Sequence, residues 1–158
     1  MEEYRRALHT ALDYELVKGG RLRKLYNEGR KYVESGKFID AFEIFDEYLV
    51  LDPNDRRVLN KKAYSLANIS EFEEAQTEVL QASPNYARAL DTQGFIFLKE
   101  GRIDEAKDWI EKAYDKNPTF VATSEHLAEV YEKLGDKENA RKYQEIAAEL
   151  RRRGAGKI

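Results

Sequence analysis

The sequence contains no cysteine, only three prolines and no long hydrophobic run. Without cysteine, disulfide bonds and thiolate chemistry are excluded. The N-terminal stretch carries charges throughout, so we expect no signal peptide, and no segment is apolar enough to predict a membrane span. Charged residues of both signs make up 36% of the chain and leave a net charge of -3, which argues against a general polyanion binder. These features predict a soluble, cytoplasmic protein.

A thirteen-residue pattern recurs four times, with starts that lie 34, 31 and 34 residues apart. Each copy begins with a small residue, has a large apolar residue three positions later, and ends with an alanine. The copies are 29–41, 63–75, 94–106 and 128–140. Glycines at 36, 101 and 135 break three of the copies near the middle, so the pattern predicts two helices per unit joined by a short turn.

Gly94 stands in an apolar, helix-forming neighbourhood, where a glycine costs roughly 0.5–1 kcal/mol relative to alanine. It occupies the small-residue position of the pattern, on the first helix of its unit. We therefore predict that Gly94 lets the two helices of the unit approach closely, and that the same holds for Gly29.

The period, the small-x-x-aromatic pattern, the later alanine and the prolines that close two units, Pro53 and Pro118, together resemble the tetratricopeptide repeat. The resemblance covers roughly residues 22–150. It implies an all-α fold, a right-handed superhelical solenoid of antiparallel helix pairs with about four repeats plus an N-terminal helix. Proteins of this family mostly bind other proteins.

The predicted organisation has three parts: an N-terminal helix at 1–20, a solenoid at 21–152 and a flexible tail at 153–158. Within the solenoid the repeats are expected at about 22–55, 56–86, 87–120 and 121–152. The second repeat is three residues short, which predicts a shorter helix ending near Gln81–Ser83. Residues 1–20 resemble the second helix of a degenerate half-repeat that ends in a turn at Gly19-Gly20, and an independent cap is the alternative.

If the helices stack as in the family, the first helix of each repeat lines a concave groove. Its N-terminal part carries arginines in register and its C-terminal part is acidic. For anion binding we select Arg23, Arg30, Arg57, Lys61 and Arg88. For contact with apolar groups we select Tyr26, Tyr64 and Phe95. The polar neighbours Asn60 and Asp91 complete the predicted peptide-binding groove: Arg23, Tyr26, Arg30, Arg57, Asn60, Lys61, Tyr64, Arg88, Asp91 and Phe95.

These positions predict a non-catalytic protein-protein interaction module, an adaptor, scaffold or chaperone-like protein. Its partner would be a protein or peptide with acidic side chains or a free C-terminal carboxylate. The family's carboxylate clamp for chaperone tails is mostly absent here, since of the matching positions only Arg88 preserves the expected chemistry.

Three alternatives remain. In the first, the arginines are ordinary solvated charges without a binding role. In the second, the chain assembles into a homo-oligomeric scaffold through repeat edges or the convex face, and Trp109 is an anchor rather than a packing residue. The third, a nucleic-acid partner, is disfavoured because the acidic C-terminal part of the groove would repel phosphates.

His126 with Glu129 and Glu125 forms too sparse a set for a metal site. No cofactor, metal or membrane insertion is expected.

Overall fold

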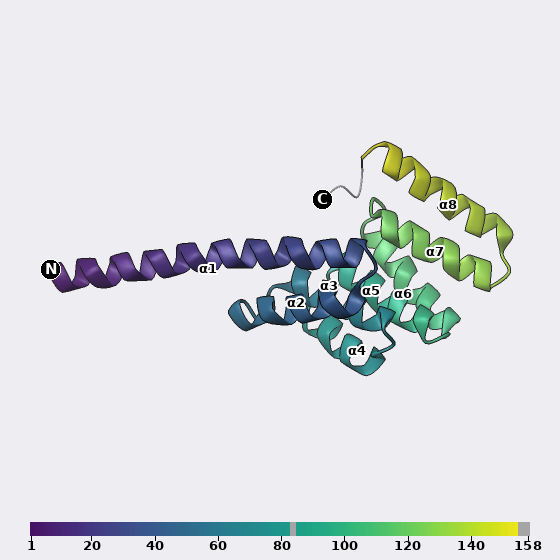
Figure 1. Ribbon diagram of the computed structural model, residues 1–158. Helices are drawn as coiled ribbons and strands as arrows, with labels where there is room; N and C mark the ends of the chain where they lie inside the picture. The colour runs from purple at the N-terminus through teal and green to yellow at the C-terminus, as the bar shows by residue number, and fades with distance from the viewer. Residues whose placement is uncertain (83–84, 155–158) are drawn as a thin grey trace.

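The computed structural model describes residues 1–82 and 85–154, and these residues form eight α-helices with no strand among them (Figure 1). The helices are α1 (Glu2–Glu34), α2 (Phe38–Leu51), α3 (Arg56–Asn68), α4 (Phe72–Gln81), α5 (Ala87–Lys99), α6 (Ile103–Lys116), α7 (Val121–Lys133) and α8 (Lys137–Arg152). They pack as consecutive pairs, α1 with α2, α3 with α4, α5 with α6 and α7 with α8, and neighbouring pairs pack on one another. The fold is an all-α solenoid.

The turn within three of the pairs depends on a glycine in the left-handed region. Gly36, Gly101 and Gly135 have φ angles of 71°, 79° and 78°, as the sequence pattern predicts. The second pair has Ser70 at the equivalent position, with φ at 67°. A residue with a Cβ atom is disfavoured there by roughly 1–2 kcal/mol, so this turn stores backbone strain that the other three avoid.

The small residues of the first helices mark close helix contacts, as predicted. A Cβ atom added to Gly94 would lie 2.4 Å from Cγ1 of Ile110, and one added to Gly29 would lie 2.4 Å from Cε1 of Phe45. The prediction for both glycines is therefore confirmed. The second and fourth pairs have alanine at these positions and a smaller or more flexible partner, Val79 or Gln144, at the facing position.

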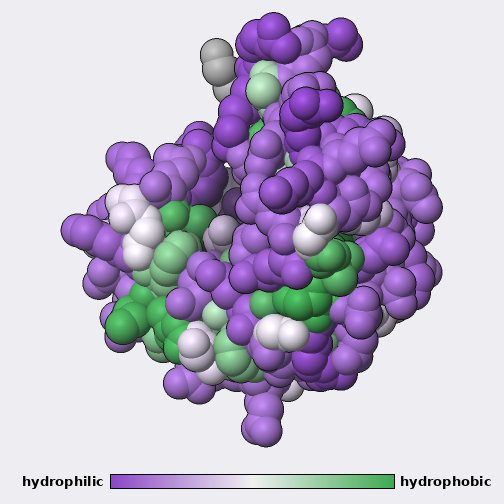
Figure 2. All heavy atoms as spheres, turned by 90° about the vertical axis from the view of Figure 1, so that its right-hand side faces the viewer, coloured by the Kyte–Doolittle hydropathy of each residue, from purple (hydrophilic) through white to green (hydrophobic). Residues whose placement is uncertain are grey.

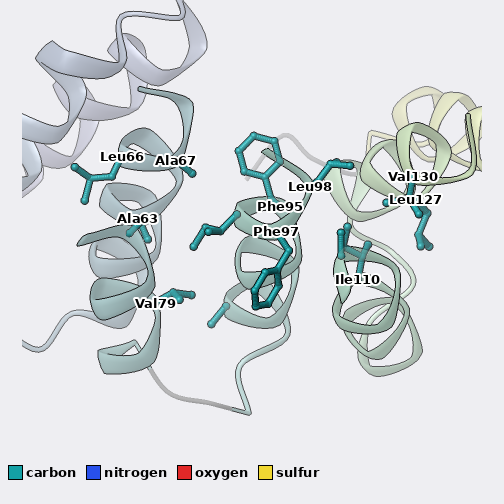
Figure 3. Packing of buried hydrophobic residues seen from close by; sticks show 14 of the residues in the cluster. Ala63, Leu66, Ala67, Val79, Phe95, Phe97, Leu98, Ile110, Leu127 and Val130 are labelled. Atoms are coloured by element: carbon teal, nitrogen blue, oxygen red, sulfur yellow. The ribbon is translucent and has the colours of Figure 1, made fainter. Parts of the chain in front are cut away.

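The core is a layer of apolar side chains that continues from pair to pair (Figure 3). Within it Leu66, Ile96, Ile110, Leu127 and Val130 are almost completely buried. A second cluster around Phe45 joins α1 and α2. The half-buried Trp109 packs against Phe97 of α5, with ring centroids 6.5 Å apart, so the packing interpretation of this tryptophan has a structural basis.

Two helix boundaries bear on the sequence predictions. Helix α1 continues without a break through Gly19 and Gly20, so the predicted turn at these residues is wrong. Both glycines have ordinary helical backbone, because the residues around them have good helix propensity and nothing packs there to bend the chain. Helix α4 has 10 residues where α2 and α6 have 14, as the shortened repeat predicts. Ser83, part of that prediction, and residues 155–158 of the tail lie outside the described residues.

The surface on the side where α6, α7 and α8 lie is mostly hydrophilic, with apolar residues gathered in two areas (Figure 2). Across the part of the chain that the structure describes, no helix combines the length and the apolar character that crossing a bilayer requires.

Candidate functional site

The first helices of successive pairs, α3, α5 and α7, contact one another, and the C-terminal half of α1 lies on the same side. Together they form a groove with two adjoining hollows of about 240 and 350 Å³. Asn60, Lys61 and Arg88 line both hollows. Of the ten residues predicted for the groove, those that line one or both hollows are Tyr26, Arg30, Arg57, Asn60, Lys61, Tyr64, Arg88 and Asp91.

Lys61 lies half-buried at the junction of the two hollows. Among the described residues, no carboxylate lies within ion-pair distance of its ammonium group. Burial, and then the neighbouring charges of Arg88 and Arg30, hold the pKa of Lys61 below its ordinary value. The charge of Glu34, which lines the same hollow, acts in the other direction but does not outweigh them. A partly desolvated cation with other cations nearby favours an incoming anion.

Arg57 is fixed by the residue that begins its own helix. The Asp55 carboxylate accepts a hydrogen bond from the backbone N–H of Arg57 at 2.9 Å. This bond caps α3 and satisfies one of the backbone donors that a helix N-terminus leaves unpaired. The same carboxylate accepts bonds from the guanidinium at 3.1 and 2.8 Å and from the hydroxyl of Tyr48 at 2.9 Å. Despite its partial burial, these bonds lower the pKa of Asp55 to about 2. Arg57 therefore has a carboxylate partner already.

The other basic residues differ in how available they are. The Arg88 guanidinium lies 4.2 Å from the centre of the Phe120 ring, which holds it over the groove by a cation–π contact. Arg30 is paired with Glu34 of the same helix at 3.2 Å. Arg23 is exposed and lines neither hollow. Arg23, Arg57 and Arg88 occupy the same position in successive repeats but are therefore not equivalent, and Arg88 is the one that lies beside Lys61.

A row of three stacked rings crosses the groove from α3 to α7. Phe95 lies between Tyr64 and His126, and its ring centroid is 4.7 Å from each of theirs. Only 4% of the Phe95 surface is exposed, so the prediction that this ring faces the groove is wrong. The rings on either side cover it. Tyr64 is half-buried and does reach the groove.

His126 forms the end of this row and is buried. Its Nδ1 atom lies 3.1 Å from both carboxylate oxygens of Asp91, on the preceding first helix. Burial lowers the pKa of His126, but the charge of Asp91 and its hydrogen bond outweigh this effect, so the net shift is upward. This pair could not be predicted directly from the residues, because the repeat period only places position 91 beside position 125 one repeat later. No cluster of three potential metal ligands occurs in the described part of the chain.

The acidic end of the groove is partly neutralised by α8. Arg151 forms an ion pair with Glu125, and Lys133 lies 4.0 Å from Glu129 on the same helix. A third hollow, of about 580 Å³, lies between α7 and α8 and is lined by Glu125, Glu129 and Glu132. The groove thus changes from basic to acidic along its length.

A chain of antiparallel helix pairs with small residues at the helix contacts defines a helical-repeat protein. The family model "Tetratricopeptide repeat" matches residues 87–120 and 125–153. Residues 87–120 and 125–153 of this chain are therefore tetratricopeptide repeats.

Relatives in sequence share this repeat. A probable UDP-N-acetylglucosamine–peptide N-acetylglucosaminyltransferase SPINDLY of Hordeum vulgare is 33% identical over 63% of this chain and 11% of its own length. The small glutamine-rich tetratricopeptide repeat-containing protein 2 of Mycosarcoma maydis is 25% identical over 77% of this chain and 35% of its own length. The chain therefore spans only about a tenth to a third of these two relatives.

Solved structures share the fold. A thermophilic tetratricopeptide-repeat protein of Thermus thermophilus superposes with a TM-score of 0.70 at 18% identity, over 84% of this chain and 74% of its own. The first such domain of human RPAP3 gives 0.61 at 21% identity, over 75% and 96%. MamA of Desulfovibrio magneticus gives 0.59 at 24% identity, over 83% and 76%.

Proposed function

We propose that this chain is a non-catalytic interaction module that binds an acidic segment of a partner protein in the groove between α1 and α7. The observation that carries the proposal is Lys61, a half-buried cation with Arg88 as its neighbour and, among the described residues, no carboxylate within ion-pair distance. An acidic side chain or a C-terminal carboxylate placed there would offset both positive charges in a partly desolvated site, where ion pairs are stronger than at the open surface.

Two features of the same hollow support a peptide rather than a small anion. The Oδ1 atom of Asn60 is buried and has no described hydrogen-bond partner, and a buried acceptor left unpaired costs about 1–3 kcal/mol. If the Asn60 amide turned into the hollow that it lines, a backbone N–H of an extended segment would satisfy this oxygen. Tyr26 and Tyr86 line the hollow and offer apolar surface beside the charges.

One structural neighbour is relevant to the class of ligand. The first repeat domain of Spaghetti (RPAP3) has been solved with an HSP90 peptide of sequence SRMEEVD, and it matches this chain with a TM-score of 0.59 at 19% identity. In this chain Tyr26, Arg30, Lys61 and Thr92 occupy clamp positions where the family has other residues. We therefore propose an acidic segment as ligand and not that particular peptide. The roles of adaptor or scaffold and the cytoplasmic location stay predictions.

The proposal is tested by selecting short peptides against the wild-type protein from a random library displayed with free C-termini. Dissociation constants of the selected peptides are then compared for wild type, Lys61→Glu/Arg88→Glu, and the control Lys112→Glu/Lys116→Glu on α6. We expect acidic peptides whose affinity falls at least about tenfold in the groove variant, an effect of about 1.4 kcal/mol, and stays unchanged in the control. Equal affinity for all three proteins would contradict the proposal.

A further inference from the structure

Residues 1–18, the N-terminal arm, form the free half of α1 and extend away from all the other helices (Figure 1). Every residue from 1 to 17 is exposed. At a rise of 1.5 Å per residue the arm is about 27 Å long. Its hydrogen bonds and ion pairs, such as that between His9 and Asp13, lie within the arm itself.

The arm has an apolar face. Tyr4, Leu8, Ala11 and Leu12 follow one another at helical spacing, and 71% of Tyr4, 49% of Leu8 and 61% of Leu12 is exposed. Eighteen residues make five helical turns, so Tyr4 and Ala11 lie on the same side of α1 as Leu22 and Gly29. That side of α1 packs against α2. The apolar face of the arm therefore continues an interface that already exists in the chain, beyond the point where α2 ends.

An isolated arm of this length would be a marginal helix. Helices of this length in water depend on packing of an apolar face, and Gly19 and Gly20 at its base each weaken it further. An atom added to either glycine would meet nothing within 4 Å, so neither glycine is explained by packing within the chain. The arm therefore has an uncovered apolar face, and a partner packed on that face would stabilise its helix.

The order of charges along the arm indicates which partner fits. Arg5 and Lys18 lie at the edges of the apolar face, and Glu15 lies within it, one turn after Ala11. When two arms lie antiparallel, Arg5 of one is opposite Glu15 of the other. A parallel pair would place like charges together, which is destabilising. An anionic membrane surface is a poor match, because residues 1–18 carry four acidic and three basic residues.

We propose that the arm binds the arm of a second copy of this chain, as an antiparallel two-helix bridge between two solenoids. In this arrangement Leu8 of each copy packs against Ala11 and Leu12 of the other, across a two-fold axis. The arm of the second copy runs antiparallel to α1, as α2 does, and lies along α1 beyond the point where α2 ends. The arm also resembles α2 in sequence. Its residues Tyr4, Ala7 and Tyr14 have the same spacing as three residues of α2, Phe38, Ala41 and Tyr48.

The apolar part of the proposal is tested by sedimentation equilibrium of the full chain over a wide range of concentrations. Wild type should reach twice the chain mass of 18.4 kDa. Leu8→Glu/Leu12→Glu should weaken the dimer at least about a hundredfold, because four leucine side chains lose their burial. Val17→Glu is the matched control: Val17 is 72% exposed and, nine residues or two and a half turns after Leu8, lies on the opposite side of the helix, so its dimer should be unchanged. All the changes are at exposed sites, and circular dichroism checks that the solenoid stays folded.

The antiparallel direction is tested by charge reversal. Arg5→Glu and Glu15→Arg should each weaken the homodimer, because each places like charges opposite one another twice. An equimolar mixture of the two variants should restore dimers, since both contacts are then complementary. Homodimers of both variants that are as stable as wild type would overturn the antiparallel arrangement.

Three other results would overturn the proposal as a whole. They are a wild-type chain that stays monomeric at all concentrations, a dimer that Leu8→Glu/Leu12→Glu leaves intact, and a monomer whose arm binds phospholipid vesicles instead. None of these depends on the groove, so the proposed peptide binding stands or fails separately.

Discussion

The substitution Gly94→Ala tests the close contact between α5 and α6. The new Cβ atom would lie 2.4 Å from Cγ1 of Ile110 and 3.1 Å from two backbone atoms, the oxygen of Ala106 and the nitrogen of Ile110. A side chain can rotate away, but the backbone of a packed helix cannot, so the two helices must separate. Overpacking of this kind costs about 1–3 kcal/mol. Alanine gains back about 1 kcal/mol of helix propensity, and we expect a net loss of about 1 kcal/mol.

Gly20→Ala is the matched control. Gly20 also lies inside a helix, but an added atom would meet nothing within 4 Å. This variant should be as stable as wild type or more stable, by up to about 1 kcal/mol. Urea unfolding followed by circular dichroism gives both values. The double variant Gly94→Ala/Ile110→Val reproduces the Ala63 and Val79 pair of the second repeat and should recover part of the loss. If Gly94→Ala stabilises the protein as much as Gly20→Ala does, the packing argument is refuted.

Three further predictions concern stability and titration. Ser70→Gly should raise the free energy of unfolding by about 1 kcal/mol, because it relieves the left-handed strain at a φ of 67°; a loss in urea unfolding would contradict this. Asp55 has a native pKa of about 2, below its ordinary value, so its stabilisation is present above about pH 4 and is lost as the pH falls toward 2. Asp55→Asn should therefore destabilise the protein at pH 7 and much less near pH 2, and an equal effect at both would refute the assignment. The raised pKa of His126 means that its pairing with Asp91 stabilises the fold fully below about pH 6.5 and is lost as the pH rises through the native pKa. In an NMR titration Asp91→Asn should lower the pKa of His126, and an unchanged pKa would be contrary to this account.

Much of the fold was predictable because its determinants are local and periodic. The small residues, the glycine turns and the apolar stripes repeat at about the same interval, and each follows from helix geometry alone. The shorter α4 could be predicted from a three-residue deletion. The continuity of α1 could not: the pair Gly19-Gly20 is compatible with either a turn or a helix, and the choice depends on whether anything packs nearby.

The groove was predictable as a set of positions but not as a set of contacts. Counting along the repeat selected Lys61 and Arg88, and both line the hollows. It could not show that Asp55 forms an ion pair with Arg57, or that the neighbouring rings bury Phe95, because these contacts depend on side-chain directions across three helices. The contacts of Lys62 could not be predicted for the same reason. Its buried ammonium forms ion pairs with Asp46 of α2 at 2.7 Å and with Glu78 of α4 at 2.6 Å, which only tertiary packing brings together.

The most direct test of the proposed groove is to titrate the isotopically labelled protein with a selected acidic peptide and to follow every backbone amide by NMR. The account predicts that the largest shifts lie around Asn60, Lys61 and Arg88, and that they vanish in Lys61→Glu/Arg88→Glu. Shifts confined to α4 and α6, or unaffected by this substitution, would contradict it.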